Sequence, residues 1–100
     1  MKFRNLEATR YIIKEATGLD ISYAYDDLVF PEHTAFIIQF DDTNDKNLFC
    51  YFRTDCDSKD KTKIYSELDR CASVDKFTIK EKGTFDLVQK EEEVEIHFNP

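Results

Sequence analysis

Glycine and proline are scarce in this chain, with two of each among 100 residues, and tryptophan is absent. So few turn formers disfavour long irregular loops and glycine-rich phosphate loops. The longest unbroken apolar run is the five residues 48–52, whereas a membrane-spanning helix needs about 20. Charged residues are spread through the first 20 residues, which lack the apolar stretch of a signal peptide. We therefore expect a cytoplasmic protein with no membrane segment.

Sequence motifs that define a chemistry are also missing, including the Gly-x-Ser-x-Gly elbow and the His-Glu-x-x-His helix. The three cysteines, Cys50, Cys56 and Cys71, cannot all pair within one chain, and no two have the short spacing of a structural zinc site. We expect reduced thiols, no metal and no cofactor. A cysteine nucleophile beside His33 or His97 stays open, but no spacing supports it. We predict that the protein is not an enzyme.

Basic residues are outnumbered, 14 to 21, which gives a formal net charge of −7. The middle third, residues 31–60, is the most acidic part, with seven acidic and three basic residues. This balance disfavours direct binding to nucleic acid or to an anionic membrane surface. Hydrophobic residues make up 41% of the chain and aromatic residues 14%, so it has material for one core. We expect residues 1–100 to form a single domain.

A central β-hairpin is the strongest local prediction. Residues 35–40 and 48–53 are rich in β-branched and aromatic side chains, and the polar turn 41–47 joins them. By two-residue alternation, both faces of both arms are largely apolar. This pattern is typical of strands that are covered on both sides.

Two amphipathic helices and further strands surround the hairpin. The predicted helices cover residues 3–17, ended by Gly18, and residues from Asp57 or Ser58 to Ser73. The predicted strands are residues 21–25, 76–80, 84–90 and 94–98, with a turn at 81–83, while residues 28–30 either resume the first strand or form a buried crossing. We predict an α+β domain of order αβββαβββ, in which an antiparallel sheet of five to six strands carries both helices on one face.

The second sheet face has no helix to cover it. It must curl onto itself, be covered by the other end of the sheet, or meet a partner, and its candidate residues are Tyr23, Ile37, Phe49 and Tyr51. Exposed apolar patches of this kind usually mark protein interfaces. Our first functional prediction is therefore a small interaction module, such as an adaptor, a chaperone-like protein or an accessory subunit, with another protein as partner and a homodimer as one form.

The acidic clusters support a second hypothesis. An inhibitor could present carboxylates where a nucleic-acid-binding enzyme expects phosphates, as small viral counter-defence proteins do by DNA mimicry. The candidate acidic face consists of Asp41, Asp42, Asp45, Asp55, Asp57 and Asp60, with residues 91–95 as a second group. Solubility alone also explains a charge of −7. A structural component of a virus particle is a third class that the sequence neither supports nor opposes.

Overall fold

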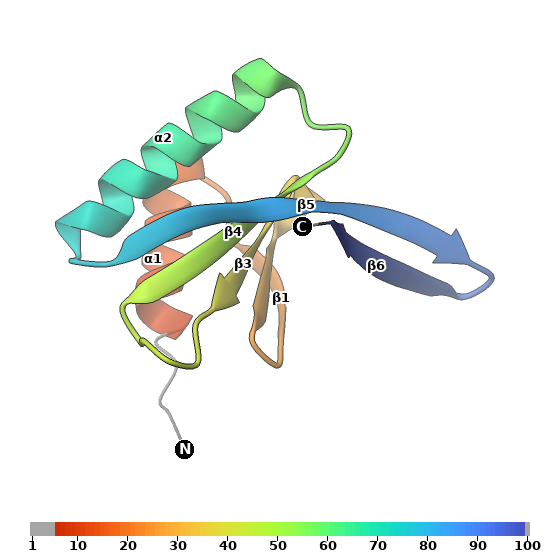
Figure 1. Cartoon of the computed structure of the whole chain (residues 1–100), viewed down its shortest axis with the longest axis horizontal. Helices are drawn as coiled ribbons and strands as arrows, with labels where there is room; N and C mark the ends of the chain where they lie inside the picture. Colours follow the sequence, from red (N-terminus) through yellow and green to blue (C-terminus); the bar gives the residue numbers. More distant parts are fainter. Residues whose placement is uncertain (1–5, 100) are drawn as a thin grey trace.

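The computed structural model describes residues 6–99, which form two helices and one six-stranded sheet (Figure 1). The prediction for residues 3–5 lies outside the described part. In chain order the elements are α1 (Leu6–Thr17), β1 (Ile21–Tyr25), β2 (Leu28–Pro31), the short 3-10 helix Glu32–Thr34, β3 (Phe36–Phe40), β4 (Asn47–Arg53), α2 (Ser58–Val74), β5 (Thr78–Lys90) and β6 (Glu93–Asn99). The predicted α+β class, with both helices on one face of the sheet, is confirmed.

The order of elements is αββββαββ, not the predicted αβββαβββ. Residues 28–31 are a separate strand, and the two strands predicted at 76–80 and 84–90 are one. The sheet order is β1-β2-β3-β4-β5-β6, and every pair is antiparallel except β4 and β5. That pair is parallel because α2 forms the connection between them, and a helical crossover returns the chain in its original direction.

Local signals set the helix ends. Gly18 ends α1 with a φ of +75°, and its N–H donates to the carbonyl of Lys14 at 2.8 Å. Glycine takes this left-handed conformation without a steric penalty, so the predicted stop is confirmed. At α2 the carboxylate of Asp57 accepts a hydrogen bond from the N–H of Lys59 at 2.8 Å. Of the two N-cap residues that the sequence allows, Asp57 and Ser58, the structure therefore uses Asp57.

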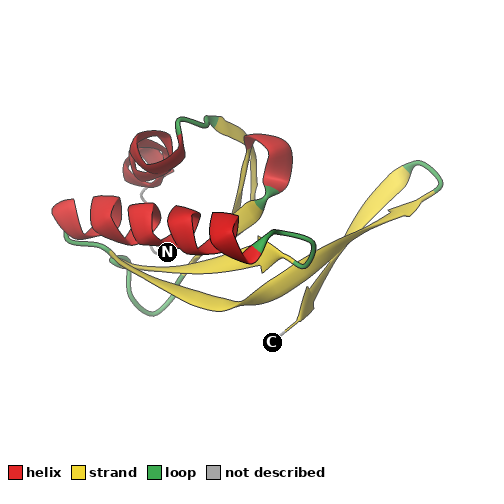
Figure 2. Ribbon diagram, turned by 90° about the horizontal axis from the view of Figure 1, so that it is seen from above, coloured by secondary structure: helices red, strands yellow, loops and turns green. Residues whose placement is uncertain are grey.

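The main core lies between the helices and the sheet. Figure 2 shows both helices on one side of the curved sheet. The cluster between these layers joins α1 and α2 to β2, β3, β4 and the start of β5, and its fully buried members include Ile12, Ile13, Phe36, Phe52 and Leu68. The alternation predicted for the hairpin is confirmed, because Phe36, Ile38 and Phe40 face this core.

A β-bulge replaces the turn predicted at residues 81–83. Cys50 pairs with Glu81, but the next residue, Tyr51, pairs with Gly83, so Lys82 is an extra residue in β5. An extra residue shifts the alternation by one, and the strand continues with its faces exchanged. Ile79 therefore packs in the helix-covered core, whereas Phe85 packs on the opposite side of the sheet.

Strands β5 and β6 extend beyond the rest of the sheet as a hairpin arm (Figure 1). The root of the arm is fixed by Asp86, which accepts hydrogen bonds from the hydroxyl of Thr54 and from Nδ2 of Asn99. The sequence predicts one buried face on β6, but Val94 is 55% exposed and Phe98 is 40% exposed. That prediction is wrong because β6 is an edge strand of a projecting arm, where little packs against it.

Candidate interaction surface

The sheet face opposite the helices carries a second apolar cluster. Ile37, Tyr51 and Phe85 are buried at its centre, and they come from β3, β4 and β5. Partly buried side chains surround them, namely Leu28, Phe30, Phe49, Leu87 and Ile96. The residues from β5 and β6 reach this cluster because the bulge turns them to this side. The sheet thus covers part of its second face by curling onto itself.

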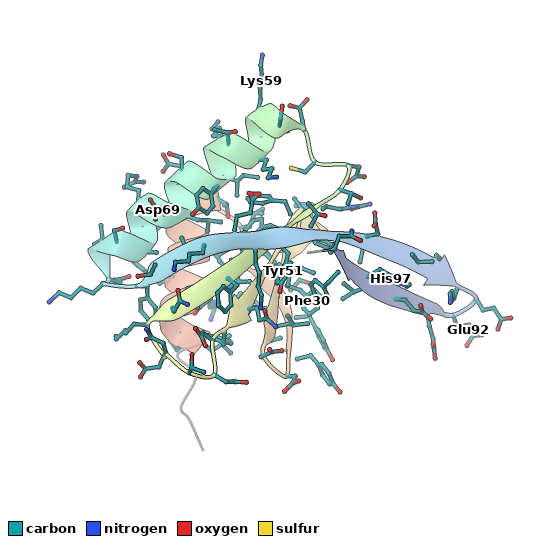
Figure 3. All side chains as sticks on the ribbon, in the orientation of Figure 1. Phe30, Tyr51, Lys59, Asp69, Glu92 and His97 are labelled. Carbon is teal, nitrogen blue, oxygen red and sulfur yellow. The ribbon has the colours of Figure 1, made fainter. Side chains whose placement is uncertain are left out.

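Exposed aromatic rings continue this cluster outward. Tyr23 and Tyr25 on β1 stack with ring centroids 6.3 Å apart and planes 10° apart, and Tyr23 also lies 5.9 Å from Phe30. At the other side, Phe98 of β6 lies 4.6 Å from Tyr51. We call the six residues Tyr23, Tyr25, Phe30, Phe49, Tyr51 and Phe98 the aromatic face. Figure 3 places Phe30 and Tyr51 on the side of the sheet turned toward the reader.

All four residues predicted for this surface lie on the same face, but they are covered to different degrees. Ile37 is fully buried and Tyr51 is 7% exposed. Phe49 is half-buried, with the ammonium of Lys82 4.5 Å above its ring, while Tyr23 is 56% exposed. Tyr23 and Phe49 are therefore accessible to a partner in this conformation, whereas Ile37 supports the surface from below.

Sequence reasoning missed three members of the aromatic face, Tyr25, Phe30 and Phe98. Tyr25 shares a strand face with Tyr23 by two-residue spacing, so the alternation contained a signal for it. Phe30 belongs to the segment 28–30, for which two interpretations were open, and its side could be assigned only once β2 was known to pair with both β1 and β3. Phe98 reaches Tyr51 through the curl of the sheet, which no local pattern encodes.

A series of side-chain hydrogen bonds links Tyr51, Gln39 and Asp27 on this face. The hydroxyl of Tyr51 donates to Oε1 of Gln39 at 3.0 Å, and Nε2 of Gln39 donates to Oδ2 of Asp27 at 2.9 Å. Buried polar groups need such partners, because an unsatisfied hydroxyl costs about 1–3 kcal/mol. These hydrogen bonds fix the ring of Tyr51 and the side chain of Gln39 in one orientation.

The six aspartates of the acidic hypothesis lie in two separate groups. Asp41, Asp42 and Asp45 occupy the turn before β4, while Asp55, Asp57 and Asp60 follow β4. The seven residues of β4 separate the groups by about 20 Å. Glu92 lies at the tip of the hairpin arm, away from both (Figure 3). The structure therefore does not bring these carboxylates into one continuous stripe.

Several of these aspartates have local structural roles. Asp41 accepts hydrogen bonds from the N–H and hydroxyl of Thr43 at 2.8 and 2.6 Å and from Nδ2 of Asn47 at 2.8 Å. Asp57 caps α2, and Asp55 forms an ion pair with Arg53 at 3.2 Å. Such contacts stabilise turns and helix starts, as expected for aspartate.

Cys50 and Cys56 lie in environments that favour the protonated thiol. All three cysteines lie among residues 6–99, and no disulfide joins them there. Burial raises the pKa of Cys50, and burial together with the nearby Asp60 raises the pKa of Cys56. A protonated thiol is a weak nucleophile and a weak metal ligand. Within the described residues, no three His, Cys, Asp or Glu side chains gather in a way that could hold a metal ion.

Comparison of the chain with protein-family models, with curated proteins and with solved structures gave no match. No helix in residues 6–99 is both long enough and apolar enough to cross a membrane. The surface chemistry of residues 6–99 is therefore the basis for a functional proposal.

Proposed function

We propose that this protein is a non-catalytic interaction module that binds another protein through the aromatic face. The observation that supports it is the exposure of Tyr23, Tyr25 and Phe98 at the rim of a buried cluster. Aromatic side chains dominate the energetics of protein interfaces, and tyrosine is well suited because one end is apolar and the other is polar. The buried residues beneath the rim give these rings a rigid support, which lowers the entropy lost on binding.

The test is affinity capture from the native host with matched surface variants. Tyr23→Ala and Phe98→Ala truncate exposed rings of the aromatic face, and Tyr11→Ala truncates a ring on α1 that is equally exposed at 57%. The first two variants should weaken capture at least tenfold, while Tyr11→Ala should not change it. Equal capture by all three variants would contradict the proposal.

The acidic-inhibitor hypothesis makes the opposite prediction in the same assay. Its binding would depend on long-range attraction, so it would weaken steeply between 50 and about 300 mM salt and be lost in Asp42→Lys/Asp45→Lys. Under our proposal, binding to the aromatic face keeps most of its affinity over that salt range.

A second copy of the chain is one possible partner. Light scattering at micromolar concentration would then give about twice the 11.8 kDa chain mass. A homodimer through the aromatic face should revert to a monomer in Phe98→Ala, whereas a constant monomer mass leaves a different protein as the partner.

A further inference from the structure

The two edges of the sheet differ in their protection against strand pairing. β6 is one edge, and its sequence places Glu93, Glu95 and His97 along the strand. Charged side chains such as these two glutamates discourage pairing with another strand. β1 is the other edge, and its sequence Ile-Ser-Tyr-Ala-Tyr contains no charged residue. Within residues 6–99, no strand pairs with the outer side of β1.

The register of β1 shows which backbone groups face outward. Tyr25 pairs with Leu28 across the two-residue turn Asp26-Asp27, and Ala24 pairs with Val29. The pair next to a two-residue turn exchanges both of its hydrogen bonds, and the following pair exchanges none. The N–H and C=O of Ala24 therefore point away from β2, toward the position of an additional strand.

Side chains of an added strand would meet the aromatic face. Directly opposed residues on neighbouring strands have Cβ atoms about 4.5–5.5 Å apart. Alternate side chains of a segment paired with β1 would thus lie beside Tyr23 and Tyr25, which are 56% and 65% exposed. Flat tyrosine rings attract the cations of lysine and arginine.

The charge distribution indicates what kind of segment would fit. Residues 15–45 contain no lysine or arginine, although the chain has 14 of them. The same span, which forms β1, β2 and β3, carries eight carboxylates: Glu15, Asp20, Asp26, Asp27, Glu32, Asp41, Asp42 and Asp45. The basic residues nearest to β1 along the chain, Arg10 and Lys14, both lie beside Asp20, at 3.0 and 4.0 Å.

Carboxylates flank β1 at both ends. At its start, the backbone N–H of Asp20 donates to Oε1 of Glu32 at 2.8 Å, which places the Glu32 carboxylate beside the main chain of Asp20. At its end, the N–H of Phe40 donates to the carbonyl of Asp27 at 2.8 Å, so the β1–β2 turn lies beside the start of the acidic turn 41–46. Figure 1 shows both turns at the same end of the sheet.

We infer that β1 accepts an extended, lysine- and arginine-rich segment of a partner protein as a seventh strand. This inference rests on the proposed function and names the chemistry of the partner. Main-chain hydrogen bonds to Ala24 would supply affinity, as in other cases of strand addition, and the acidic surroundings with the tyrosine rings would select basic side chains. A second copy fits this edge poorly, because a symmetric antiparallel pairing would bring Asp20 and Glu32 of one copy near Asp26 and Asp27 of the other.

The test uses two synthetic nine-residue peptides, one alternating arginine with valine and one alternating glutamate with valine, measured by isothermal titration calorimetry. The basic peptide should bind the full chain, and the acidic peptide should not. Amide hydrogen exchange by NMR should slow at the N–H of Ala24 when the basic peptide is bound. Fast exchange at Ala24 in the complex, or equal binding of both peptides, would overturn the inference.

Three variants separate strand addition from simple charge attraction. Ala24→Pro removes the outward N–H, at an edge position where proline is tolerated, and should weaken the basic peptide at least tenfold. Ala24→Ser keeps the N–H and should bind as the wild type does. Asp26→Asn/Asp42→Asn/Asp45→Asn should weaken binding several-fold, and asparagine suits the positive φ of +55° at position 26. Unchanged binding in Ala24→Pro would overturn the inference, as would a dimer that Ala24→Pro converts to a monomer.

The two proposals fail in different ways. If the basic peptide does not bind but a captured partner still depends on Tyr23 and Phe98, strand addition at β1 is wrong and the aromatic face is still the interaction surface. If no captured partner depends on those two rings, the proposed function is wrong whatever the peptides do.

Discussion

The two faces of the sheet are covered by different elements, and the type of covering element determines how much apolar surface stays exposed to solvent. Each helix brings its own apolar stripe to the first face, so Phe36, Phe52 and Leu68 are fully buried there. Within residues 6–99, the second face is covered by the edges of the same sheet, which curl toward it. A curled edge buries the centre of a face and leaves its rim exposed, so the aromatic face is open while the helix-covered face is closed.

The largest expected effect comes from a comparison of two phenylalanines of β4, Phe49 and Phe52, that face opposite sides of the sheet. Phe52→Ala leaves a cavity in the helix-covered core and should lower the free energy of unfolding by about 3–5 kcal/mol. Phe49→Ala truncates a half-buried ring and should cost less than half as much. Urea denaturation of the two variants measures both values, and equal losses would show that the second face is packed as tightly as the first.

The cover of the first face also depends on the start of α2. Asp57→Ala removes the acceptor for the N–H of Lys59 and should cost about 1 kcal/mol. Asp57→Asn keeps an acceptor oxygen at the N-cap and should restore most of this loss. The same denaturation measurement tests it, and equal stability of both variants would argue against a capping role.

A smaller effect is expected on the second face from Tyr51→Phe. This change deletes the hydroxyl that donates to Gln39 and keeps the ring against Phe98, so the cost should be about 0.5–1.5 kcal/mol. Crystal or NMR structures should show Gln39 in a new rotamer. A loss of stability well above this range would mean that these hydrogen bonds stabilise the second face more than the buried side chains at its centre do.

The smallest expected effect concerns the anchor of the hairpin arm at low pH. Hydrogen bonds from Thr54 and Asn99 hold the pKa of Asp86 below its ordinary value. A lowered folded-state pKa contributes stability that is present above the unfolded-state pKa, near 4, and that is lost as the pH falls through the folded-state pKa. Thermal unfolding followed from pH 6 down to about pH 2 should therefore show a shallower decrease for Asp86→Asn than for wild type. Parallel curves would mean that this carboxylate does not stabilise the arm.

Much of the fold could be predicted from short-range signals in the sequence. The alternation in residues 35–40 and 48–53, Gly18 and the cap at Asp57 each act within a few residues, and all three predictions are confirmed. Gly83 was misread because a glycine inside an apolar pattern is compatible with a turn or with a bulge. The pairing with β4 distinguishes them, because it continues on both sides of Lys82, from Thr78 to Phe85, and so keeps β5 extended.

The candidate site was less predictable because exposure is not a local property. Alternation assigned Ile37 and Tyr51 to the face without helices, and both lie there. Whether they reach solvent depends on Phe85 and Phe98, which approach from strands far along the chain. The charge pattern of residues 15–45 was visible in the sequence, but its meaning required knowing that β1 is an edge.

The bulge at Lys82 makes the position of the arm sensitive to chain length rather than to side-chain identity. Deleting this one residue would restore plain alternation along β5 and turn Phe85 and Leu87 toward the helices, where the space is already filled. The second apolar cluster would lose Phe85 from its centre at the same time. The fold should tolerate substitutions at this position but not single-residue insertions or deletions between residues 80 and 84. A library that contains both kinds of change would show this as a clear difference in the fraction of folded variants.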